Sequence, residues 1–266
     1  MKYGYLAVEG PHDLAFVGRL LKLHDLDRVK KLSELDPFFR PLVPRVFPHQ
    51  DDLLKRVPVP TFFASTTHAI AVHVVEGDGG FPHAIQDSLD TIHAEPGPEL
   101  TGIGVLLDAD SRVPALDRFR RLKTSLDATP FPRPIRFPDA PGEVSATLPH
   151  AGVFVLPDNA RQGTLEDLLL ECARVVYPTL EAGAQAYLTA ATAASELRAE
   201  DRKEFGKPAG RSKALVACIA SFLRPGKATQ VSLQDNRWLE APIARFPQVA
   251  AIHDFLASLL ELPAPP

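Results

Sequence analysis

Acidic residues follow three of the apolar segments that the sequence predicts to be strands. Glu9 comes directly after the first segment, Asp108 and Asp110 after the third, and Asp158 after the fourth. Asp13 lies one helical turn beyond Glu9, so both carboxylates can face the same edge. In an open α/β sheet, ligands bind outside the carboxyl ends of the strands. The spacing therefore predicts a cluster of carboxylates at one edge of a sheet.

Carboxylates that gather at one spot repel one another, which raises their pKa values. A hard cation removes this cost, and oxygen ligands of this kind suit Mg²⁺ or Mn²⁺. Two such ions about 4 Å apart can hold the attacking and leaving oxygens during phosphodiester hydrolysis. Glu166 and Asp167, at the start of a later predicted helix, could join the cluster. The acids therefore predict a divalent-metal site.

Short apolar runs alternate with helical patterns along the first 160 residues. The strands and helices that this pattern predicts must position the acids. It predicts an α/β fold in which a mainly parallel four-stranded sheet carries helices on both faces. The expected strands are residues 6–8, 69–75, 103–107 and 152–156, and the expected helices are residues 14–23, 82–93 and 114–125. Between the first two strands, the proline-rich residues 31–68 predict a long insertion with a short helix near 51–56.

The remainder of the chain is predicted to be helical. Apolar stripes at helical spacing occur around residues 165–172, 215–222 and 249–259. We therefore expect an α/β domain over residues 1–177 and a helical extension over 178–266 that packs on it. The length of 266 residues is compatible with this division.

Composition excludes several classes of protein. Lys plus Arg is 29 and Asp plus Glu is 33, which excludes a uniformly basic nucleic-acid coat but not a local basic groove. Two cysteines, Cys172 and Cys218, are too few for a disulfide framework or a cysteine-based zinc site. The first ten residues resemble neither a signal peptide nor a membrane span, so we expect a cytoplasmic protein with no membrane partner.

Four segments together resemble a known family. Val8-Glu9-Gly10-Pro11-His12-Asp13 resembles the first motif of the Toprim domain, and Leu107-Asp108-Ala109-Asp110 resembles its aspartate pair after the third strand. Residues 163–169 and 211–214 resemble further motifs of the Toprim nucleases of the OLD (overcoming lysogenization defect) group and of related uncharacterised bacterial proteins. The resemblance covers about residues 3 to 225.

The resemblance implies a Toprim (Rossmann-like) fold and a nuclease that depends on Mg²⁺ or Mn²⁺, with two ions, and acts on DNA or RNA. Glu9 would be the general acid/base or first metal ligand, and Lys213 would stabilise charge on the phosphate. Arg211 would bind substrate, and the remaining metal ligands would be Asp13, Asp108, Asp110, Glu166 and Asp167. The sequence lacks the phosphate-binding loop of the ATPase that is joined to OLD nucleases, so a separate ATPase would be a partner.

Each of these residues also has a purely structural interpretation. Asp108 and Asp110 could be turn or cap residues before the helix at Pro114. Glu166 and Asp167 suit a helix start, where Thr164 and Asp167 would form a capping box. Lys213 could belong to a solvated basic face, and Glu76 and its neighbours suit a tight turn better than a second acidic motif.

Two functions therefore remain open. The first is a stand-alone metal-dependent nuclease, with phage defence as one setting, in which the basic clusters at 118–123 and 198–213 receive phosphate. The alternative is a Toprim-fold binding or regulatory module that does not cleave. A phosphatase with an aspartyl nucleophile is disfavoured, because its Asp-x-Asp should follow the first strand and here it follows the third.

Overall fold

Four parallel strands form the centre of the fold in the computed structural model, which describes residues 1–266 except 46–58, 76–78, 95–96, 111, 241–244 and 265–266. They are β4 (His68–Val74), β1 (Lys2–Val8), β5 (Gly102–Asp108) and β6 (His150–Leu156), in that spatial order. All four are almost continuously apolar, as strands covered on both faces must be. The parallel α/β class predicted from the sequence is confirmed.

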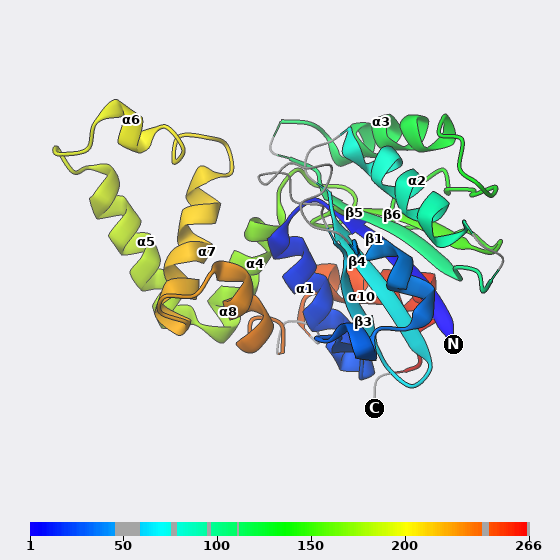
Figure 1. Cartoon of the computed structure of the whole chain (residues 1–266). Helices are drawn as coiled ribbons and strands as arrows, with labels where there is room; N and C mark the ends of the chain where they lie inside the picture. The colour runs from blue at the N-terminus through cyan, green and yellow to red at the C-terminus, as the bar shows by residue number, and fades with distance from the viewer. Residues whose placement is uncertain (46–58, 76–78, 95–96, 111, 241–244, 265–266) are drawn as a thin grey trace.

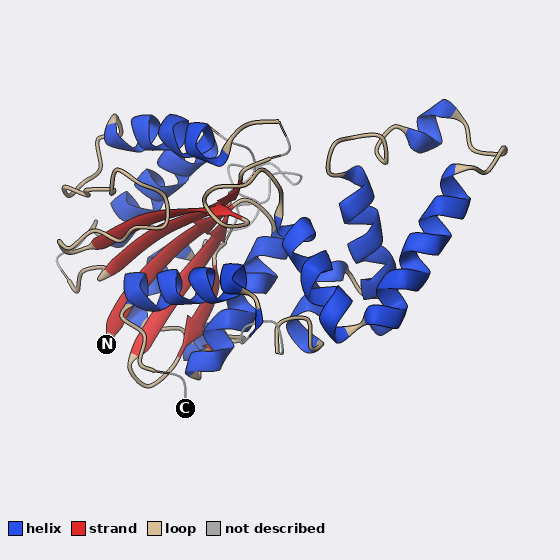
Figure 2. Cartoon of the chain, turned by 180° about the vertical axis from the view of Figure 1, so that it is seen from behind, coloured by secondary structure: helices blue, strands red, loops and turns tan. Residues whose placement is uncertain are grey.

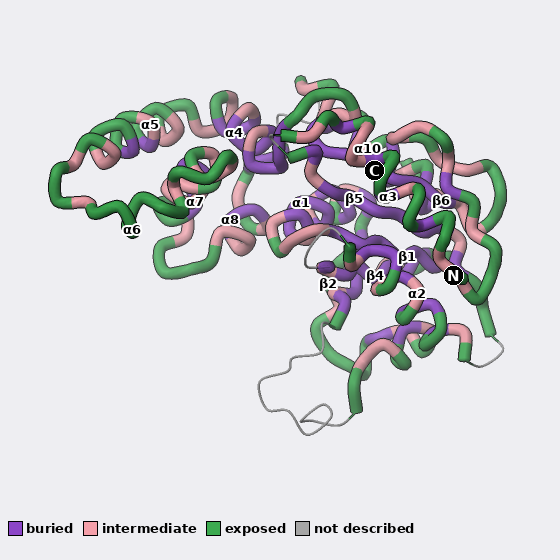
Figure 3. Tube along the Cα trace, turned by 90° about the horizontal axis from the view of Figure 1, so that it is seen from above, coloured by how far each residue is buried: buried purple, intermediate pink, exposed green. Residues whose placement is uncertain are grey.

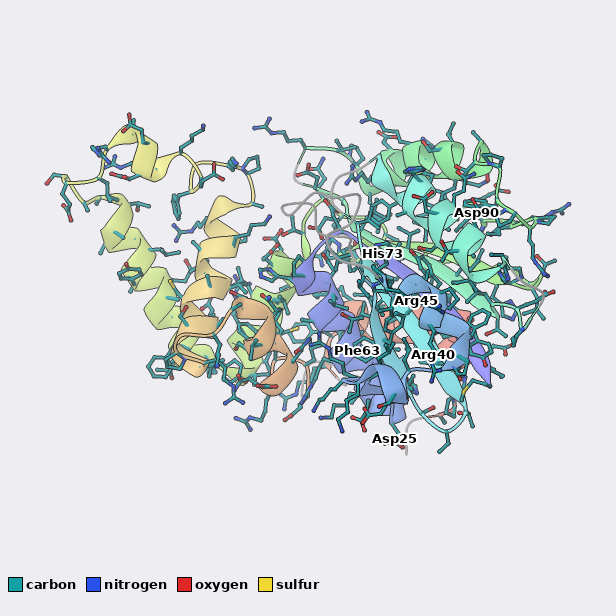
Figure 4. All side chains as sticks on the ribbon, in the orientation of Figure 1. Asp25, Arg40, Arg45, Phe63, His73 and Asp90 are labelled. Atoms are coloured by element: carbon teal, nitrogen blue, oxygen red, sulfur yellow. The ribbon has the colours of Figure 1, made fainter. Side chains whose placement is uncertain are left out.

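The sheet has six strands rather than the four that we predicted. β3 (Thr61–Ala64) pairs antiparallel with β4, and β2 (Asp27–Arg28) pairs antiparallel with β3. β3 lies inside the expected insertion, where its four residues are too short to show a strand period. The ring of Phe63 packs against Gly18 of α1 (Pro11–Leu21), as Figure 4 indicates by its position beside that helix. The insertion therefore extends the sheet and covers the edge of β4.

The described residues 32–43 of the insertion pack on the same side of the sheet as α2. Two short 3-10 helices, η2 (Leu32–Glu34) and η3 (Pro37–Leu42), follow β2, and the Phe39 ring of η3 is fully buried. The short helix expected near residues 51–56 lies outside the described residues. A further 3-10 turn, η1 (Lys22–His24), continues α1 at its C-terminal end.

Helices cover both faces of the sheet (Figure 1), as the sequence predicts. One face packs on α1 and α10 (Pro247–Leu260), and the other packs on α2 (Gly80–Ile92) and α3 (Ala115–Asp127). Successive strand residues point to opposite faces, so Leu6 and Val8 belong to the first core and Tyr5 and Ala7 to the second. The Tyr5 hydroxyl lies 2.6 Å from His73 Nδ1 and 2.9 Å from Ser88 Oγ, which ties β1 to β4 and α2.

The described chain after β6 is helical. α4 (Leu165–Val176) lies beside the sheet, and α5 (Pro178–Thr192) and α7 (Gly210–Leu223) project from it as a pair that carries α6 (Ala199–Arg202) at its tip (Figures 1 and 2). We call residues 178–223 the arm. Within the arm, most residues of α5 and α6 are exposed (Figure 3). α8 (Thr229–Asp235) packs on α1.

The last helix returns to the sheet and lies directly on glycines of the central strands. A Cβ atom at Gly102 would overlap the carbonyl oxygen of Leu259, and one at Gly104 would overlap the Leu259 side chain. Glycine is required at Gly102, where the close neighbour is the α10 backbone, whereas the leucine side chains that face Gly104 could move. α10 is therefore part of the sheet domain and not of the arm. No helix among the described residues is both long enough and apolar enough to span a membrane.

We predict that Gly102→Ala lowers the free energy of unfolding by about 1 to 3 kcal/mol, because the new methyl group has no room beneath the α10 backbone. Gly183→Ala in α5 is the control, since nothing lies within 4 Å of its added Cβ. In a helix interior that change should stabilise the protein by about 0.5 to 1 kcal/mol. Denaturant unfolding measures both, and equal effects would contradict the proposed packing of α10.

Candidate functional site

A pocket of about 370 Å³ lies at the carboxyl ends of β1 and β5. β1 and β5 are neighbours in the sheet, so Glu9, directly after β1, and Asp108, the last residue of β5, lie side by side. Asp13 comes from the first turn of α1, and Glu166 from the first turn of α4. The pocket is lined by these four acids together with His12 and Lys213. The structure therefore brings together four of the six predicted metal ligands and the predicted lysine.

Glu9 and Asp108 are joined to each other and to Arg118 of α3. The Asp108 backbone N–H donates to Glu9 Oε2 at 3.1 Å. Arg118 Nε donates to the Asp108 carbonyl oxygen at 3.2 Å, and Arg118 Nη2 lies 3.6 Å from Glu9 Oε2. The guanidinium thereby supplies positive charge beside Glu9 and holds the ends of two strands together.

Our sequence interpretation of Arg118 as an exposed member of a basic cluster was wrong. Its side chain is only 12% exposed and points toward the strand ends. A signal was available, because Arg118 lies at helical spacing from the buried residues Ala115 and Leu122 and therefore on the inward face of α3. Its neighbours Arg120 and Arg121 are exposed, as expected.

Asp108 also has the structural role that we considered, but at a different helix. Its Oδ1 accepts a hydrogen bond from the backbone N–H of Leu165 at 2.8 Å, so it binds the N-terminus of α4. The partial positive charge of a helix N-terminus favours a carboxylate there. At α3, the N-cap position is Pro114 and has no side-chain cap. Asp108 therefore anchors α4 to the sheet edge and remains in the pocket lining.

Asp167 and Asp110 lie outside the lining of this pocket. Asp167 forms the expected capping box with Thr164, and its Oδ1 accepts a hydrogen bond from Ser212 Oγ at 2.6 Å. This contact fixes the start of α7, and therefore Lys213, against α4. Asp110 adopts a left-handed backbone, φ 69°, and exchanges two backbone hydrogen bonds with Gly163. Both aspartates thus hold the loops that surround the site.

Two other candidates are engaged elsewhere. Arg211 Nη2 donates to Gln185 Oε1 of α5 at 2.7 Å and does not line the pocket. Asp158 accepts hydrogen bonds from the backbone of Ala160 and Arg161 and forms an ion pair with the Arg161 side chain. The fourth strand therefore contributes no carboxylate to the lining. Glu76 lies outside the described residues.

His12 is a site residue that we had not predicted as one. Its Nδ1 lies 3.1 Å from Glu166 Oε1, and both side chains line the pocket. Burial alone would raise the pKa of Glu166, but the His12 hydrogen bond and the charge of Lys213 together hold that pKa below its usual value. Glu166 is therefore ionised near neutral pH. The adjacency of His12 to Glu9 was the available signal in the sequence.

Asp13 is the acid of the pocket with a buried side-chain oxygen that is unpartnered within the described chain. Its side chain is buried, and its Oδ1 has no hydrogen-bond partner among the described residues. Burial, followed by the charges of Glu9 and Glu166, raises the pKa of Asp13 to about 7. Burial and the charges of Asp13, Glu9 and Glu166 likewise raise the pKa of Asp108 well above its usual value. Without added positive charge, the pocket therefore retains protons on its aspartates.

The donor set fits a hard divalent cation that keeps much of its water shell. Four carboxylates face one pocket, and the orphaned, buried Asp13 oxygen is of the type that Mg²⁺ binds. Within the described ranges, no three His, Cys, Asp or Glu side chains form a ready-made metal cage. Mg²⁺ does not require such a cage, because it is usually bound through one or two carboxylates, several waters and substrate phosphate.

We predict a pH-dependent difference in stability between the wild type and Asp13→Asn in the absence of divalent cations. The pKa of Asp13 is raised in the folded state, so the folded protein binds this proton more tightly than the unfolded chain does. The wild type should therefore lose stability relative to the variant as the pH rises from about 4 to about 7. Because the pKa of Asp13 changes from 3.8 to about 7 on folding, the free energy of unfolding of the wild type relative to the variant should change by roughly 4 kcal/mol over this pH range.

Urea unfolding of both proteins at several pH values in EDTA measures this difference. Asp90→Asn, on the outer side of α2, is the control. Its free energy of unfolding should change with pH in the same way as that of the wild type. A constant offset between Asp13→Asn and the wild type across this range would show that Asp13 is not a high-pKa carboxyl.

Comparisons with known proteins extend over nearly the whole chain. A crystal structure of the hypothetical protein PH0156 from Pyrococcus horikoshii OT3 is similar in fold, with a TM-score of 0.54 and 17% sequence identity. The match covers 97% of this chain and 95% of that one. No curated protein matches the sequence. The model of a family described as "Protein of unknown function (DUF3226)" matches residues 3–261, so the chain belongs to the DUF3226 family.

Proposed function

We propose that this protein is a metal-dependent phosphodiesterase that cleaves nucleic acid, with the Toprim arrangement of acids. The observation that carries the proposal is the buried, unpartnered Oδ1 of Asp13, which shares a pocket with three further carboxylates. Such a group is costly to bury unless a charged partner arrives. A divalent cation is the partner that also binds phosphate oxygens.

Further support comes from the order of the acids along the fold. Glu9 follows β1 and Asp108 ends β5, and these parallel strands are adjacent in the sheet. This is the placement expected from the Toprim resemblance, in which the glutamate and the aspartate pair follow the first and third parallel strands. Lys213 lines the pocket, where it would meet the charge of a phosphate, and Arg118 stands beside Glu9.

Each residue of the site would have its own role in the reaction. Asp13, Asp108 and Glu9 would hold Mg²⁺ or Mn²⁺, which when bound polarises phosphate oxygens and lowers the pKa of water. Glu9 is placed to accept a proton from an attacking water, and Arg118 keeps its Oε2 oriented. Lys213 lies in the pocket lining and would neutralise charge on the phosphate. Glu166, ionised beside His12, orients the imidazole toward the same pocket.

A binding or regulatory module that does not cleave is the second candidate. It is favoured by one observation, namely that Glu9 Oε2 and Asp108 Oδ1 both accept backbone N–H groups of the protein. In that case the acids serve to hold β1, β5 and α4 together. A role as an effector in phage defence, with ATP hydrolysis by a separate partner, belongs to the nuclease proposal and depends on it.

We predict that about 10 mM Mg²⁺ raises the melting temperature of the wild type by about 3 to 6 °C. A site with a Kd near 1 mM gains roughly 1.4 kcal/mol at this concentration, which corresponds to that shift for a chain of this size. Asp108→Asn should lose most of the shift because it removes a charged ligand. Its apo form should be at least as stable as the wild type, since the amide oxygen can still accept the Leu165 N–H.

Asp108→Ala separates the structural role from the charge. It removes the acceptor for the Leu165 N–H and should be about 1 kcal/mol less stable than Asp108→Asn. Differential scanning calorimetry with and without Mg²⁺ measures all three proteins. If Asp108→Asn melts lower than the wild type and keeps the full Mg²⁺ shift, Asp108 is a structural residue only.

We predict that the purified protein cleaves nucleic acid in Mg²⁺ or Mn²⁺, and that Glu9→Gln reduces the rate by at least about 100-fold. Glutamine has nearly the same shape but neither accepts a proton nor balances the charge of a cation. Glu34→Gln, at an exposed position on η2, is the matched control and should cleave at the wild-type rate. Equal activity in wild type and Glu9→Gln would attribute the cleavage to a contaminant or to another site.

A further inference from the structure

A second concave surface, of about 680 Å³, lies between the arm and the sheet edge. Its cationic side chains are Arg112, Arg202, Lys203 and Lys207, and no acidic residue lines it within the described part of the chain. Arg112 follows β5, whereas the other three belong to α6 and the turn after it, at the tip of the arm (Figure 1). We call these four residues the basic pocket. It joins two parts of the fold that are far apart in sequence.

Short stretches of chain connect both walls of the basic pocket to the pocket at the ends of β1 and β5, which we call the acidic pocket. Arg112 lies four residues after Asp108, so their Cα atoms are at most about 14 Å apart. Lys207 lies six residues before Lys213, and the intervening chain is compact because the Gly210 N–H donates to the Lys207 carbonyl oxygen. A polymer that occupies the acidic pocket can therefore extend to Arg112 and Lys207, and along the basic pocket to the tip of the arm.

The charges of the basic pocket are only partly used within the protein. Arg202 donates to the Ala194 carbonyl oxygen, and Lys207 forms an ion pair with Glu204. Among the described residues, Arg112 and Lys203 have neither a hydrogen bond nor an ion pair through their side chains. Four cations without an acid in the same concavity repel one another and attract an anion. Guanidinium and ammonium groups are the side chains that bind phosphate most strongly.

We propose that the basic pocket binds the phosphodiester backbone of a nucleic-acid strand whose neighbouring phosphates enter the acidic pocket. This inference rests on the proposed function and specifies where on the protein the nucleic-acid strand is held. It assigns to the arm, through α6, the task of holding the strand. A net charge of -4 is compatible with this role, because the four cations share one concavity that no acidic residue lines within the described part of the chain.

The test is equilibrium binding of fluorescent 30-nucleotide single-stranded DNA and RNA in EDTA, where metal-dependent cleavage cannot occur, at several salt concentrations. The variant Arg112→Gln/Lys203→Gln removes one cation from each wall of the basic pocket. The control Lys22→Gln/Lys227→Gln removes the same charge at two exposed positions, one just after α1 and one in the turn between α7 and α8. Melting curves establish that both variants fold.

We expect the pocket variant to bind about tenfold or more weakly at low salt, with a slope of log affinity against log salt that is smaller by about 1.4 to 1.8. Two lost phosphate contacts at about 0.7 to 0.9 each give this change. The control variant should keep the wild-type slope. An unchanged slope in the pocket variant, or an equal loss in the control, would overturn the inference.

The binding result is separable from the proposed function. Pocket-dependent binding by a wild-type protein that fails to cleave in Mg²⁺ or Mn²⁺ supports the basic pocket and contradicts the nuclease. If cleavage depends on Glu9 but the Arg112→Gln/Lys203→Gln variant binds nucleic acid as tightly as the wild type, the nuclease proposal is supported and the basic-pocket inference is overturned. The order of affinities for the DNA and RNA strands then identifies which polymer the pocket prefers.

Discussion

Repulsion between carboxylates in one partly closed pocket is the constraint on which the site depends. Glu9, Asp13, Asp108 and Glu166 come from two strand ends and two helix starts, and burial strengthens their mutual repulsion. The protein compensates some of this charge with side chains and helix ends nearby. Arg118 stands beside Glu9, His12 and Lys213 act on Glu166, and the N-terminus of α4 binds Asp108. The Oδ1 atom of Asp13 has no hydrogen-bond partner among the described residues, and burial together with the charges of Glu9 and Glu166 raises the pKa of Asp13 to about 7.

The remainder of the fold fixes the positions of these acids. Close packing of α10 on Gly102 and Gly104 fixes β5 in the sheet, and β5 ends at Asp108. At the other side of the pocket, Asp167 links the start of α4 to Ser212 and so places Lys213. We expected both Asp108 and Asp167 to be metal ligands, but they differ in position. Asp108 lines the pocket, whereas Asp167 holds α4 and α7 together. The same framework positions the base of the arm, whose tip carries most of the basic pocket.

Much of the central sheet could be predicted from the sequence, because a strand buried on both faces leaves a continuous apolar run. The acids at the strand ends were equally visible, since Glu9 and Asp108 interrupt those runs. β3 could not be predicted, because its four residues lie in a proline-rich stretch and gain their strand structure from pairing with β4. Sequence also did not distinguish Asp108, which lines the pocket, from Asp110, which joins two loops. Asp110 lies beyond the end of β5 with a left-handed backbone, φ 69°, which the Asp-x-Asp pattern does not reveal.

The central claim is that the acidic pocket binds a divalent cation through Asp13 and its neighbours. Anomalous diffraction from a crystal soaked in Mn²⁺ tests this most directly, because it locates the ion without reference to activity or stability. The account predicts an anomalous peak within coordination distance of Asp13 and of Glu9 or Asp108, and its loss in a crystal of Asp13→Asn. A soaked crystal with no peak in this pocket, or with a peak only at surface acids elsewhere, would contradict it.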